Sequence, residues 1–339
     1  MMSTIQNERI LLVSRPKGVP TAENFTIDQQ PLEEAKEGQL QIQTLYISVD
    51  PYMRGRMSEA KSYAASYALN EPVSGGSIGK VLQSNDARYQ EGDIVVGGWG
   101  WQRYAVVEAD TCRKVDPELA PISTAVGVLG MPGLTAYFGT LRIGNPQPGE
   151  TLVVSGAGGA VGMLVGQIGK IKGCRVVGIS GSEEKNRYLL DELGFDAVIN
   201  YKDEKPVREA LEEACPDGVD IYFDNVGGEI SDAVIDLLNT NARIPLCGQI
   251  SLYNNEKPDI GPRIQPTLLK RTVLLKGFLV GDYAADAAEG LKEMGSWVQQ
   301  GKIKYRENIV EGFENTPQAF IGLFSGENLG KQLVKVTDQ

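Results

Sequence analysis

Residues 151–173 contain a glycine pattern that can bring a phosphate close to the main chain. The apolar run "TLVVSGA" predicts a buried strand, and apolar residues recur at helical spacing from Val161 onwards. Between them lies the pattern A-x-G-x-x-G, formed by Ala157, Gly159 and Gly162. Gly159 would let a pyrophosphate approach the backbone, Gly162 would let the helix pack closely on the strand, and the helix N-terminus would attract the anion. A tight strand-to-helix turn without a ligand is the alternative.

The end of the next expected strand favours a phosphorylated dinucleotide. NAD enzymes usually place an acidic residue there for the adenine ribose, whereas NADP enzymes offer small residues and a cation to the 2′-phosphate. Here the strand "RVVGIS" leads into Ser180, Gly181 and Ser182, and Lys185 follows one turn later, which favours NADP. Ser182 can also be the N-cap of a helix with Lys185 simply solvated. Both interpretations can hold, because a cap does not occupy the lysine side chain.

Strand-like and helix-like segments alternate around these residues. After "TLVVSGA", the runs "RVVGIS", "AVIN", "VDIYFDNV", "ARIPLCG" and "TVLLKGFLV" read as strands separated by amphipathic helices. Such alternation predicts parallel strands with right-handed crossovers, hence an α/β fold with a doubly wound parallel sheet of the Rossmann type over residues 126–300. Residues 1–125 predict a β-rich domain. Residues 301–339 read as strand, helix and strand and are expected to return to that first domain.

Composition excludes several classes of function. The 339 residues include no histidine, so catalytic zinc and the usual serine or cysteine nucleophiles lose their commonest partner. A net charge of −11 argues against nucleic-acid binding. The four cysteines stand far apart without a C-x-x-C pair, so we expect reduced thiols and no metal site. No membrane-length apolar run and no signal sequence occur, so we expect a cytoplasmic protein.

Several long motifs occur in the order that one protein family shows. They are "SVDPYMRGRM", "GMPGLTAYFGTL", "GAVGMLVGQIGKIKGC", "GSEEK", "VINYK", "YFDNVGG", "CGQISLYN", "WVQQGKIKY", "IVEGFENTPQAF" and "GENLGK". On these motifs the chain resembles the zinc-independent medium-chain dehydrogenase/reductases, most closely the prostaglandin reductase, leukotriene hydroxydehydrogenase and curcumin reductase group of NADPH-dependent alkenal/one oxidoreductases. The resemblance covers nearly the whole chain. It implies a Rossmann NADP-binding domain together with a GroES-like catalytic domain.

The resemblance also implies a set of residues that contact NADP(H). The pyrophosphate loop of the family matches Gly159, Ala160 and Val161, and its 2′-phosphate contacts match Lys185 and Tyr201. The positions that border the ribose and nicotinamide, or reach the cofactor from the returning C-terminal segment, are Asn225, Gly248, Ser251, Tyr253, Phe278, Leu279, Val280 and Asn328. On burial habit alone, Phe278 to Val280 would be assigned to the core.

The reaction that the resemblance implies is reduction of a C=C bond conjugated to a carbonyl. Zinc members carry an early cysteine ligand in the region that looks like "SVDPYMR", which contains no cysteine, so carbonyl reduction would lack its Lewis acid. Reduction of an α,β-unsaturated aldehyde or ketone asks for hydride at the β-carbon and hydrogen-bond donors at the enolate oxygen. A tyrosine or a ribose hydroxyl could donate there. Tyr253 is the first candidate, followed by Tyr63 and Tyr52.

Two other functions remain open at this point. A zinc-free NADPH quinone reductase would share the cofactor domain, although "SVDPYMR" and "CGQISLYN" favour the alkenone group. A cofactor-binding protein that has lost catalysis would keep the same NADPH contacts. We expect a small-molecule enone or enal as the partner, with neither nucleic acid nor membrane. The apolar run "TVLLKGFLV" would need covering as an edge strand, so we also expect a homodimer.

Overall fold

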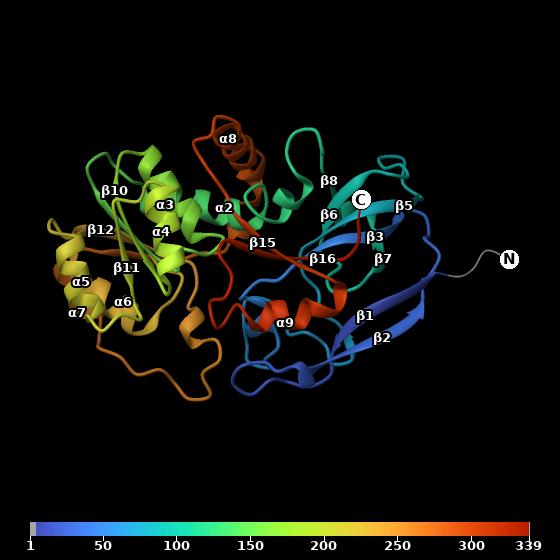
Figure 1. Ribbon diagram of the computed structural model, residues 1–339, viewed down its shortest axis with the longest axis horizontal. Coiled ribbons are helices and arrows are strands. Elements are labelled where there is room, and N and C mark those ends of the chain that lie inside the picture. Colours follow the sequence, from blue (N-terminus) through green and yellow to red (C-terminus); the bar gives the residue numbers. More distant parts are fainter. Residues whose placement is uncertain (1–4, 339) are drawn as a thin grey trace. The chain divides into compact units, whose positions relative to one another are not determined.

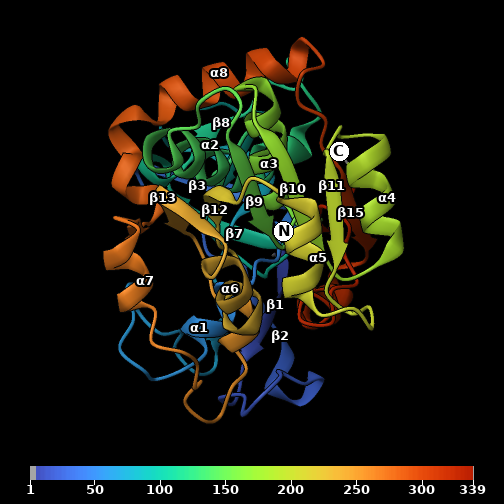
Figure 2. The same cartoon turned by 90° about the vertical axis from the view of Figure 1, so that its left-hand side faces the viewer.

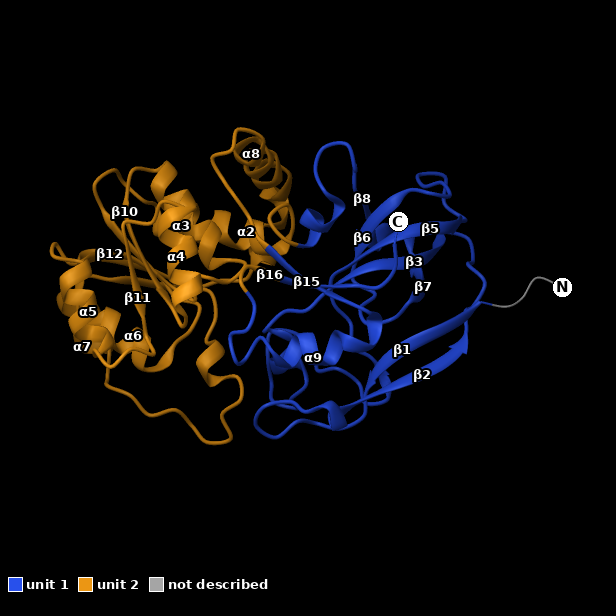
Figure 3. Cartoon of the chain, in the orientation of Figure 1, with its two compact units in different colours: residues 1–126, 307–328, 332–339 blue, residues 127–306, 329–331 orange. Residues whose placement is uncertain are grey.

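Two compact units make up the chain, coloured separately in Figure 3. The computed structural model describes residues 5–338. One unit is mixed α/β and comprises Gly127–Arg306 together with Leu329–Lys331. The other is β-rich and comprises the remaining described residues, including the returning segment Glu307–Asn328.

The α/β unit is built on a six-stranded parallel sheet (Figure 1). Its order is β11-β10-β9-β12-β13-β14, which along the chain is the 3-2-1-4-5-6 order of a doubly wound sheet. The predicted parallel sheet is therefore confirmed. Strand order reverses between β9 and β12, and ligands of such sheets bind outside the carboxyl ends of the strands at that point. The strands are β9 (Thr151–Ser155), β10 (Arg175–Ser180), β11 (Ala197–Asn200), β12 (Val219–Phe223), β13 (Leu238–Leu246) and β14 (Leu274–Gly277).

Helices cover both faces of this sheet (Figure 2). Along β9, Leu152 and Val154 pack in a cluster with α2, α3 and α8, whereas Val153 packs in a cluster with α5 and α6. Because side chains alternate between the faces of a strand, a strand covered on both faces must be apolar throughout. The helices are α2 (Met131–Phe138), α3 (Gly162–Ile171), α4 (Glu183–Asp191), α5 (Val207–Ala214), α6 (Gly228–Ile235), α7 (Gln265–Lys270) and α8 (Ala287–Gln299), with a π-helical turn, η4 (Gly139–Gly144), and 3-10 turns η5 (Ile250–Leu252) and η6 (Val280–Asp286).

The β-rich unit contains two sheets (Figure 1). A three-stranded sheet has the order β2-β1-β4, from Phe25–Pro31, Gln6–Leu12 and Glu71–Pro72. A seven-stranded sheet has the order β15-β16-β3-β5-β6-β8, with β7 paired to β3. Its strands are β3 (Gln39–Ser48), β5 (Ser77–Ser84), β6 (Ile94–Gly97), β7 (Tyr104–Glu108), β8 (Arg113–Lys114), β15 (Glu307–Glu311) and β16 (Lys331–Lys335), and the short helices are α1 (Met53–Arg56) and α9 (Thr316–Ile321). Within residues 5–338, no helix has both the length and the apolar character needed to cross a bilayer.

Local sequence signals locate several element boundaries. Helix α2 begins at Met131 with Pro132 in its first turn, where proline is favoured because the first N–H groups of a helix have no partner inside it. Ser182 is the N-cap of α4, and its hydroxyl accepts the Lys185 N–H at 3.3 Å. The strand expected over "TVLLKGFLV" is shorter than predicted, because β14 ends at Gly277. The Leu279 N–H then donates to the Asp282 carboxylate at 3.0 Å. This bond caps the 3-10 turn that begins at Val280, so the strand does not continue.

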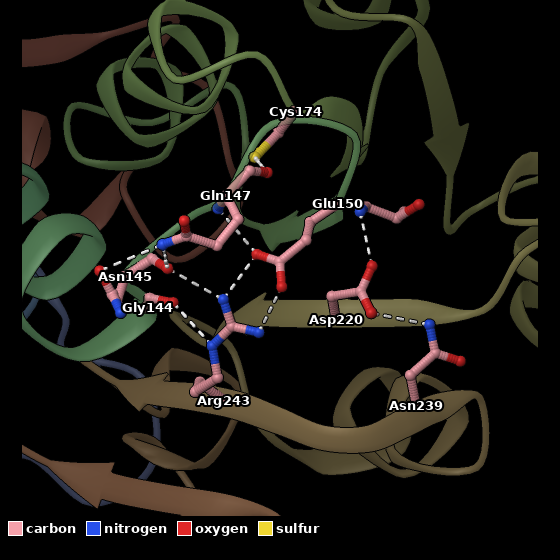
Figure 4. A network of polar contacts seen from close by, with 9 residues as sticks. Gly144, Asn145, Gln147, Glu150, Cys174, Asp220, Asn239 and Arg243 are labelled. Atoms are coloured by element: carbon pink, nitrogen blue, oxygen red, sulfur yellow. Dashed lines mark hydrogen bonds and ion pairs between the residues drawn. The ribbon is translucent and has the colours of Figure 1, made fainter.

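A polar network joins the strands near their amino ends (Figure 4). Arg243 on β13 makes two parallel hydrogen bonds to the Glu150 carboxylate, at 2.8 and 2.6 Å. Asp220 on β12 accepts the Thr151 N–H and the Asn239 side-chain amide, both at 2.8 Å. Ligands of such sheets bind at the carboxyl ends of the strands, and this network lies at the opposite, amino ends. We therefore assign this network to stability.

Candidate active site

The glycine loop between β9 and α3 brings two stretches of main chain into close contact. Gly156 has a φ of +62°, a conformation that side chains disfavour, and its carbonyl oxygen accepts the Gly159 N–H at 3.0 Å. A Cβ on Gly162 would stand 2.3 Å from the same oxygen. The first turn of α3 therefore approaches the end of β9 so closely that only glycine fits. This is the packing role that the A-x-G-x-x-G spacing predicts for Gly162.

Gly159, Ala160 and Val161 form the turn that leads into α3. The first N–H groups of a helix have no partner inside the helix, so the N-terminus of α3 is the kind of place where main-chain donors bind phosphate. The returning C-terminal segment is bonded to the loop: the Gly330 N–H donates to the Gly158 carbonyl oxygen at 2.8 Å, and Gly159 and Gly330 form a parallel bridge. Asn328, a partly buried residue, lies two positions earlier in this segment.

Lys185 and Tyr201 lie near the glycine loop and the end of β10. A Cβ on Gly158 would stand 2.9 Å from Lys185 Cδ, so the lysine stem lies across the loop. A Cβ on Gly181 would stand 2.7 Å from the Tyr201 ring. Burial, and after it the charge of Lys202, lower the pKa of Lys185. Lys202 was not singled out from the sequence, although it directly follows Tyr201, and its Nζ lies 5.8 Å from that ring centroid.

Asn225, Gly248 and Tyr253 meet beyond the carboxyl ends of β9, β12 and β13. The Asn225 side-chain amide donates to the Ser155 carbonyl oxygen at 2.8 Å. The Tyr253 hydroxyl accepts the Gln249 N–H at 3.3 Å. A Cβ on Gly248 would stand 3.2 Å from that hydroxyl, so a larger residue would push the tyrosine away. These residues share the end of the sheet where the strand order reverses.

Ser251 and Asp224 tie the same loops together. The Ser251 hydroxyl donates to the Val226 carbonyl oxygen at 2.6 Å, so this side chain bonds a neighbouring loop. Asp224 was missed by sequence reasoning and is 3% exposed. Its carboxylate accepts hydrogen bonds from both loops, including the Gln249 side chain at 2.9 Å. The available signal was an aspartate directly after a buried strand and before "NVGG".

Phe278, Leu279 and Val280 have different environments. Phe278 is 7% exposed and packs edge-on against Phe223, with ring centroids 6.2 Å apart. Its side chain is thus part of the core, as burial habit alone indicated. Leu279 is 41% exposed, and Val280 begins the 3-10 turn that follows.

The other two candidate tyrosines belong to the β-rich unit. Tyr52 is half-buried directly before α1, and burial, followed by the nearby Asp50, raises its pKa well above the usual range. Tyr63 is 64% exposed and close enough to Tyr52 to contribute to that rise. Tyr67 joins them; burial raises its pKa too, and its hydroxyl donates to the Ser74 carbonyl oxygen at 2.7 Å. The hydroxyl groups of Tyr52, Tyr63 and Tyr67 therefore lie near one another in the β-rich unit.

The residues of the α/β unit fit a phosphorylated dinucleotide. The turn before α3 presents main-chain donors, and two lysines stand near the end of β10, where no acidic side chain follows the strand until α4 begins. Burial and, after it, the charge of Lys202 lower the pKa of Lys185, and an anion bound near both lysines would offset their repulsion. Among residues 5–338 no three His, Cys, Asp or Glu side chains are grouped so as to hold a metal ion.

Comparison with known proteins identifies the relatives of this chain. Residues 8–115 match the family described as the N-terminal domain of oxidoreductase, and residues 160–297 match the family described as zinc-binding dehydrogenase. NADPH-dependent curcumin reductase of Escherichia coli is 47% identical over 98% of this chain and 97% of its own. The NADP(+)-dependent 2-alkenal reductase of Nicotiana tabacum is 40% identical over 99% of both chains. The crystal structure of CurA from Vibrio vulnificus in complex with NADPH superposes with a TM-score of 0.94, at 46% identity, over 98% of this chain and 100% of that chain.

The fold and the glycine loop define a two-domain dehydrogenase/reductase with a Rossmann domain and a GroES-like domain. The chain belongs to the zinc-independent medium-chain dehydrogenase/reductases, in the group of NADP-dependent alkenal/one oxidoreductases, enzymes whose cofactor is NADP(H). Both the fold class and the family expected from the sequence are confirmed.

Proposed function

We propose that this protein uses NADPH to reduce the C=C bond of α,β-unsaturated aldehydes and ketones. The observation that carries the proposal is its similarity, over nearly the whole of both chains, to a curcumin reductase and a 2-alkenal reductase. A 2-alkenal is an α,β-unsaturated aldehyde, and curcumin is a conjugated enone. The shared chemistry of these two substrates is an electron-poor double bond beside a carbonyl group.

The proposed cofactor site combines a phosphate loop with a cationic end. The main chain of Gly159, Ala160 and Val161 would hold the pyrophosphate, and Lys185 and Tyr201, with Lys202, would hold the 2′-phosphate. A charge-assisted contact of about 1.5–3 kcal/mol favours NADPH over NADH by about ten- to a hundredfold. The ribose and nicotinamide would be bordered by Asn225, Gly248, Ser251, Tyr253, Leu279, Val280, the main chain of Phe278, and Asn328.

Tyr253 is the proposed donor to the substrate oxygen or to the cofactor ribose. When bound, NADPH supplies a hydride to the β-carbon, the negative charge passes to the enolate oxygen, and a proton added at the α-carbon completes the saturated product. The Tyr253 hydroxyl accepts the Gln249 N–H, and a hydroxyl that accepts one hydrogen bond donates another more strongly. Hydrogen-bond donors suffice for an enolate, so this reaction needs no metal. Tyr63 and Tyr52 are the alternative donors from the β-rich unit.

Analysis of the product tests this reaction directly. The enzyme would be incubated with NADPH and the simple enone 3-nonen-2-one, and the product identified by gas chromatography with mass spectrometry. We expect 2-nonanone, the saturated ketone; formation of the allylic alcohol would contradict the proposal. Turnover of 1,4-naphthoquinone without turnover of the enone would favour a zinc-free quinone reductase. Bound NADPH with neither reaction would favour a non-catalytic cofactor-binding protein.

We propose a homodimer formed through the β14 edge of the parallel sheet. Within the described residues, strand β14 pairs only with β13, and all four of its residues are exposed. Leu274 is 50% exposed and Leu275 is 37% exposed, so an apolar strand edge is open to a second copy. Light scattering should give twice the 36.7 kDa chain mass at micromolar concentration. Leu274→Lys should reduce this mass to that of the monomer, and a monomeric wild type would overturn the proposal.

We also propose that the protein works in a reducing, cytoplasmic compartment. All four cysteines are free thiols, of which Cys174 and Cys215 are buried. Burial raises the pKa of each of these two to about 11, which keeps them protonated and unreactive. Fractionation of cells that express the native protein would test this location, and recovery from an extracytoplasmic fraction would contradict it.

A further inference from the structure

Asp224 collects an unusual number of donors for one buried side chain. It follows the last residue of β12, at the carboxyl end of the parallel sheet, and is 3% exposed. Six groups surround its carboxylate within hydrogen-bonding distance: at Oδ1 the N–H groups of Val226 (3.0 Å) and Gly227 (2.9 Å), the Tyr222 hydroxyl (2.9 Å) and the Ser155 hydroxyl (3.2 Å), and at Oδ2 the Ser231 hydroxyl (2.7 Å) and the Gln249 side-chain amide (2.9 Å). Both oxygens of the Asp224 carboxylate thus accept hydrogen bonds from within the protein.

These contacts join the two loops that carry the proposed site residues. One loop follows β12 and contains Asn225; the other follows β13 and contains Gly248 and Tyr253. The carboxylate accepts the N–H groups of the first loop and the Gln249 side chain of the second. The main-chain oxygen of Asp224 also accepts the N–H of Gly248 at 3.1 Å. Asp224 therefore contacts both loops through its side chain and the second loop also through its main chain.

Gln249 extends this connection to the tyrosine. Its side-chain amide donates to Asp224 at 2.9 Å, while its main-chain N–H donates to the Tyr253 hydroxyl at 3.3 Å. A Cβ on Gly227 would stand 2.2 Å from Gln249 Oε1, so the glutamine side chain is in close contact with the first loop. Two hydrogen bonds through a single residue thus separate the Asp224 carboxylate from the Tyr253 hydroxyl.

Asp220, on the same strand, provides a matched comparison. It accepts hydrogen bonds from the Thr151 N–H and from the Asn239 side chain, the second of which Figure 4 shows, so it also joins neighbouring strands. It lies near the amino end of β12, whereas Asp224 follows the carboxyl end. The two aspartates thus both bond neighbouring segments, at opposite ends of β12, and of the two only Asp224 is bonded to the loops of the proposed site.

We propose that Asp224 is a positioning residue for the reduction, because it fixes Asn225 and Tyr253 relative to each other through the two loops and Gln249. The part of the proposal that concerns Tyr253 as a donor rests on the proposed function. The part that concerns the ordering of the loops does not. A positioning role predicts a loss of turnover without loss of adenine-end binding, since Lys185 lies on α4 and Tyr201 follows β11, away from both loops.

Three measurements on Asp224→Asn and Asp220→Asn test this proposal. The kcat for 3-nonen-2-one with NADPH should fall about 10- to 100-fold in Asp224→Asn and little in Asp220→Asn, because small misplacement of reacting groups has effects of that size. The Kd of 2′,5′-ADP, measured by calorimetry, should stay within about twofold in both, since distant sites act independently. In the free protein, amide hydrogen exchange of residues 226–227 and 247–248 should speed up about tenfold in Asp224→Asn alone.

Gln249→Met provides a second variant if Asp224→Asn does not fold. It keeps the length of the side chain and removes the side-chain hydrogen bonds from Gln249 to Asp224 and to the Gly248 carbonyl oxygen, while the main-chain bond from Gly248 to Asp224 remains. Its kcat should fall, because the Tyr253 hydroxyl is less firmly placed. Adding Gln249→Met to Tyr253→Phe should cause little further loss, because the hydroxyl that Gln249 positions is then already absent. Fully additive losses would indicate that Gln249 does not act through Tyr253.

The outcomes separate the two proposals. If wild type fails to reduce 3-nonen-2-one, the proposed function is wrong, and hydrogen exchange alone decides whether Asp224 orders the loops. If exchange at both loops and kcat respond equally to Asp220→Asn and Asp224→Asn, the positioning role is overturned. A large rise in the Kd of 2′,5′-ADP in Asp224→Asn would likewise overturn it, since the defect would then extend beyond the two loops.

Discussion

Lys185 lies across Gly158, with its Cδ 2.9 Å from the place where a Cβ on that glycine would stand. This contact joins the expected 2′-phosphate residue to the expected pyrophosphate loop. The aliphatic stem of Lys185 is thus packed against the loop. Its ammonium group is close enough to Lys202 for the charge of Lys202 to lower its pKa, after the larger effect of burial. The sequence interpretation in which Lys185 is merely solvated does not describe this packing.

Lys202→Ala is expected to move the alkaline limit of NADPH use to higher pH. Burial and then Lys202 lower the pKa of Lys185, so the ammonium form is present below that pKa and is lost as the pH rises through it. Without the Lys202 charge, the pKa of Lys185 rises again. The profile of kcat/KM for NADPH against pH reports this group in the free enzyme. Lys270→Ala, on helix α7, should leave the profile unchanged; an unmoved profile in Lys202→Ala would contradict the assignment.

Gly162→Ala is expected to weaken binding of NADPH and NADH alike. The new Cβ would stand 2.3 Å from the Gly156 carbonyl oxygen, so the turn before α3 must shift. We expect a stability loss of about 1–3 kcal/mol, the usual effect of overpacking. Calorimetric titration with both cofactors and urea unfolding would measure the two effects. Gly98→Ala is the control, since a Cβ there would meet nothing within 4 Å; equal behaviour of the two variants would refute the close approach.

Tyr253→Phe is expected to lower kcat for 3-nonen-2-one by about a hundredfold, the effect of removing one oxyanion donor. The aromatic ring remains, so the KM for NADPH should change little. Tyr63→Phe and Tyr52→Phe are the matched variants from the β-rich unit, and Tyr63 is 64% exposed. If Tyr63→Phe or Tyr52→Phe shows the large loss while Tyr253→Phe does not, the donor to the enolate is in the β-rich unit.

Arg243→Met is expected to destabilise the α/β unit by about 2 kcal/mol at pH 7, because it breaks two charge-assisted hydrogen bonds to Glu150. Burial alone would raise the pKa of Glu150, but the Arg243 guanidinium and the Gln147 N–H bring it below its usual value. The pair therefore stabilises the fold above the ordinary glutamate pKa of 4.5 and less as the pH falls through the lowered value.

Urea unfolding at pH 7 and at about pH 3 would measure this difference, which should shrink at the lower pH. Arg208→Met is the control, because Arg208 and its partner Glu212 are more than half exposed and such pairs contribute little. A loss in Arg243→Met that is the same at both pH values would show that the ion pair is not its source.

The strands were predictable where they are buried on both faces. The run "RVVGIS" coincides with β10, and "AVIN" coincides with β11, because continuous β-branched residues bounded by polar turns leave few alternatives. The end of β14 was not predictable from such a run, because it depends on the capture of the Leu279 N–H by Asp282. The π-helical turn Gly139–Gly144 was also missed, since apolar periodicity does not distinguish it from a continuing α-helix.

The candidate site was predictable where one short motif carries it. The glycine loop and the Ser182 cap needed only local spacing, and the structure contains both. Asp224 could not be found in this way, because its donors come from Ser155, Ser231 and Gln249, which are far apart in the sequence. Phe278 was suggested by resemblance to border the cofactor, yet its side chain lies in the core.

The most direct test of the account is cofactor oxidation with 3-nonen-2-one, comparing NADPH with NADH for wild type and Lys185→Ala. The account predicts that wild type strongly prefers NADPH, and that Lys185→Ala loses most of this preference while its activity with NADH stays near that of wild type. No preference in wild type, or a preference that survives in Lys185→Ala, would contradict the assignment of the 2′-phosphate site to this lysine.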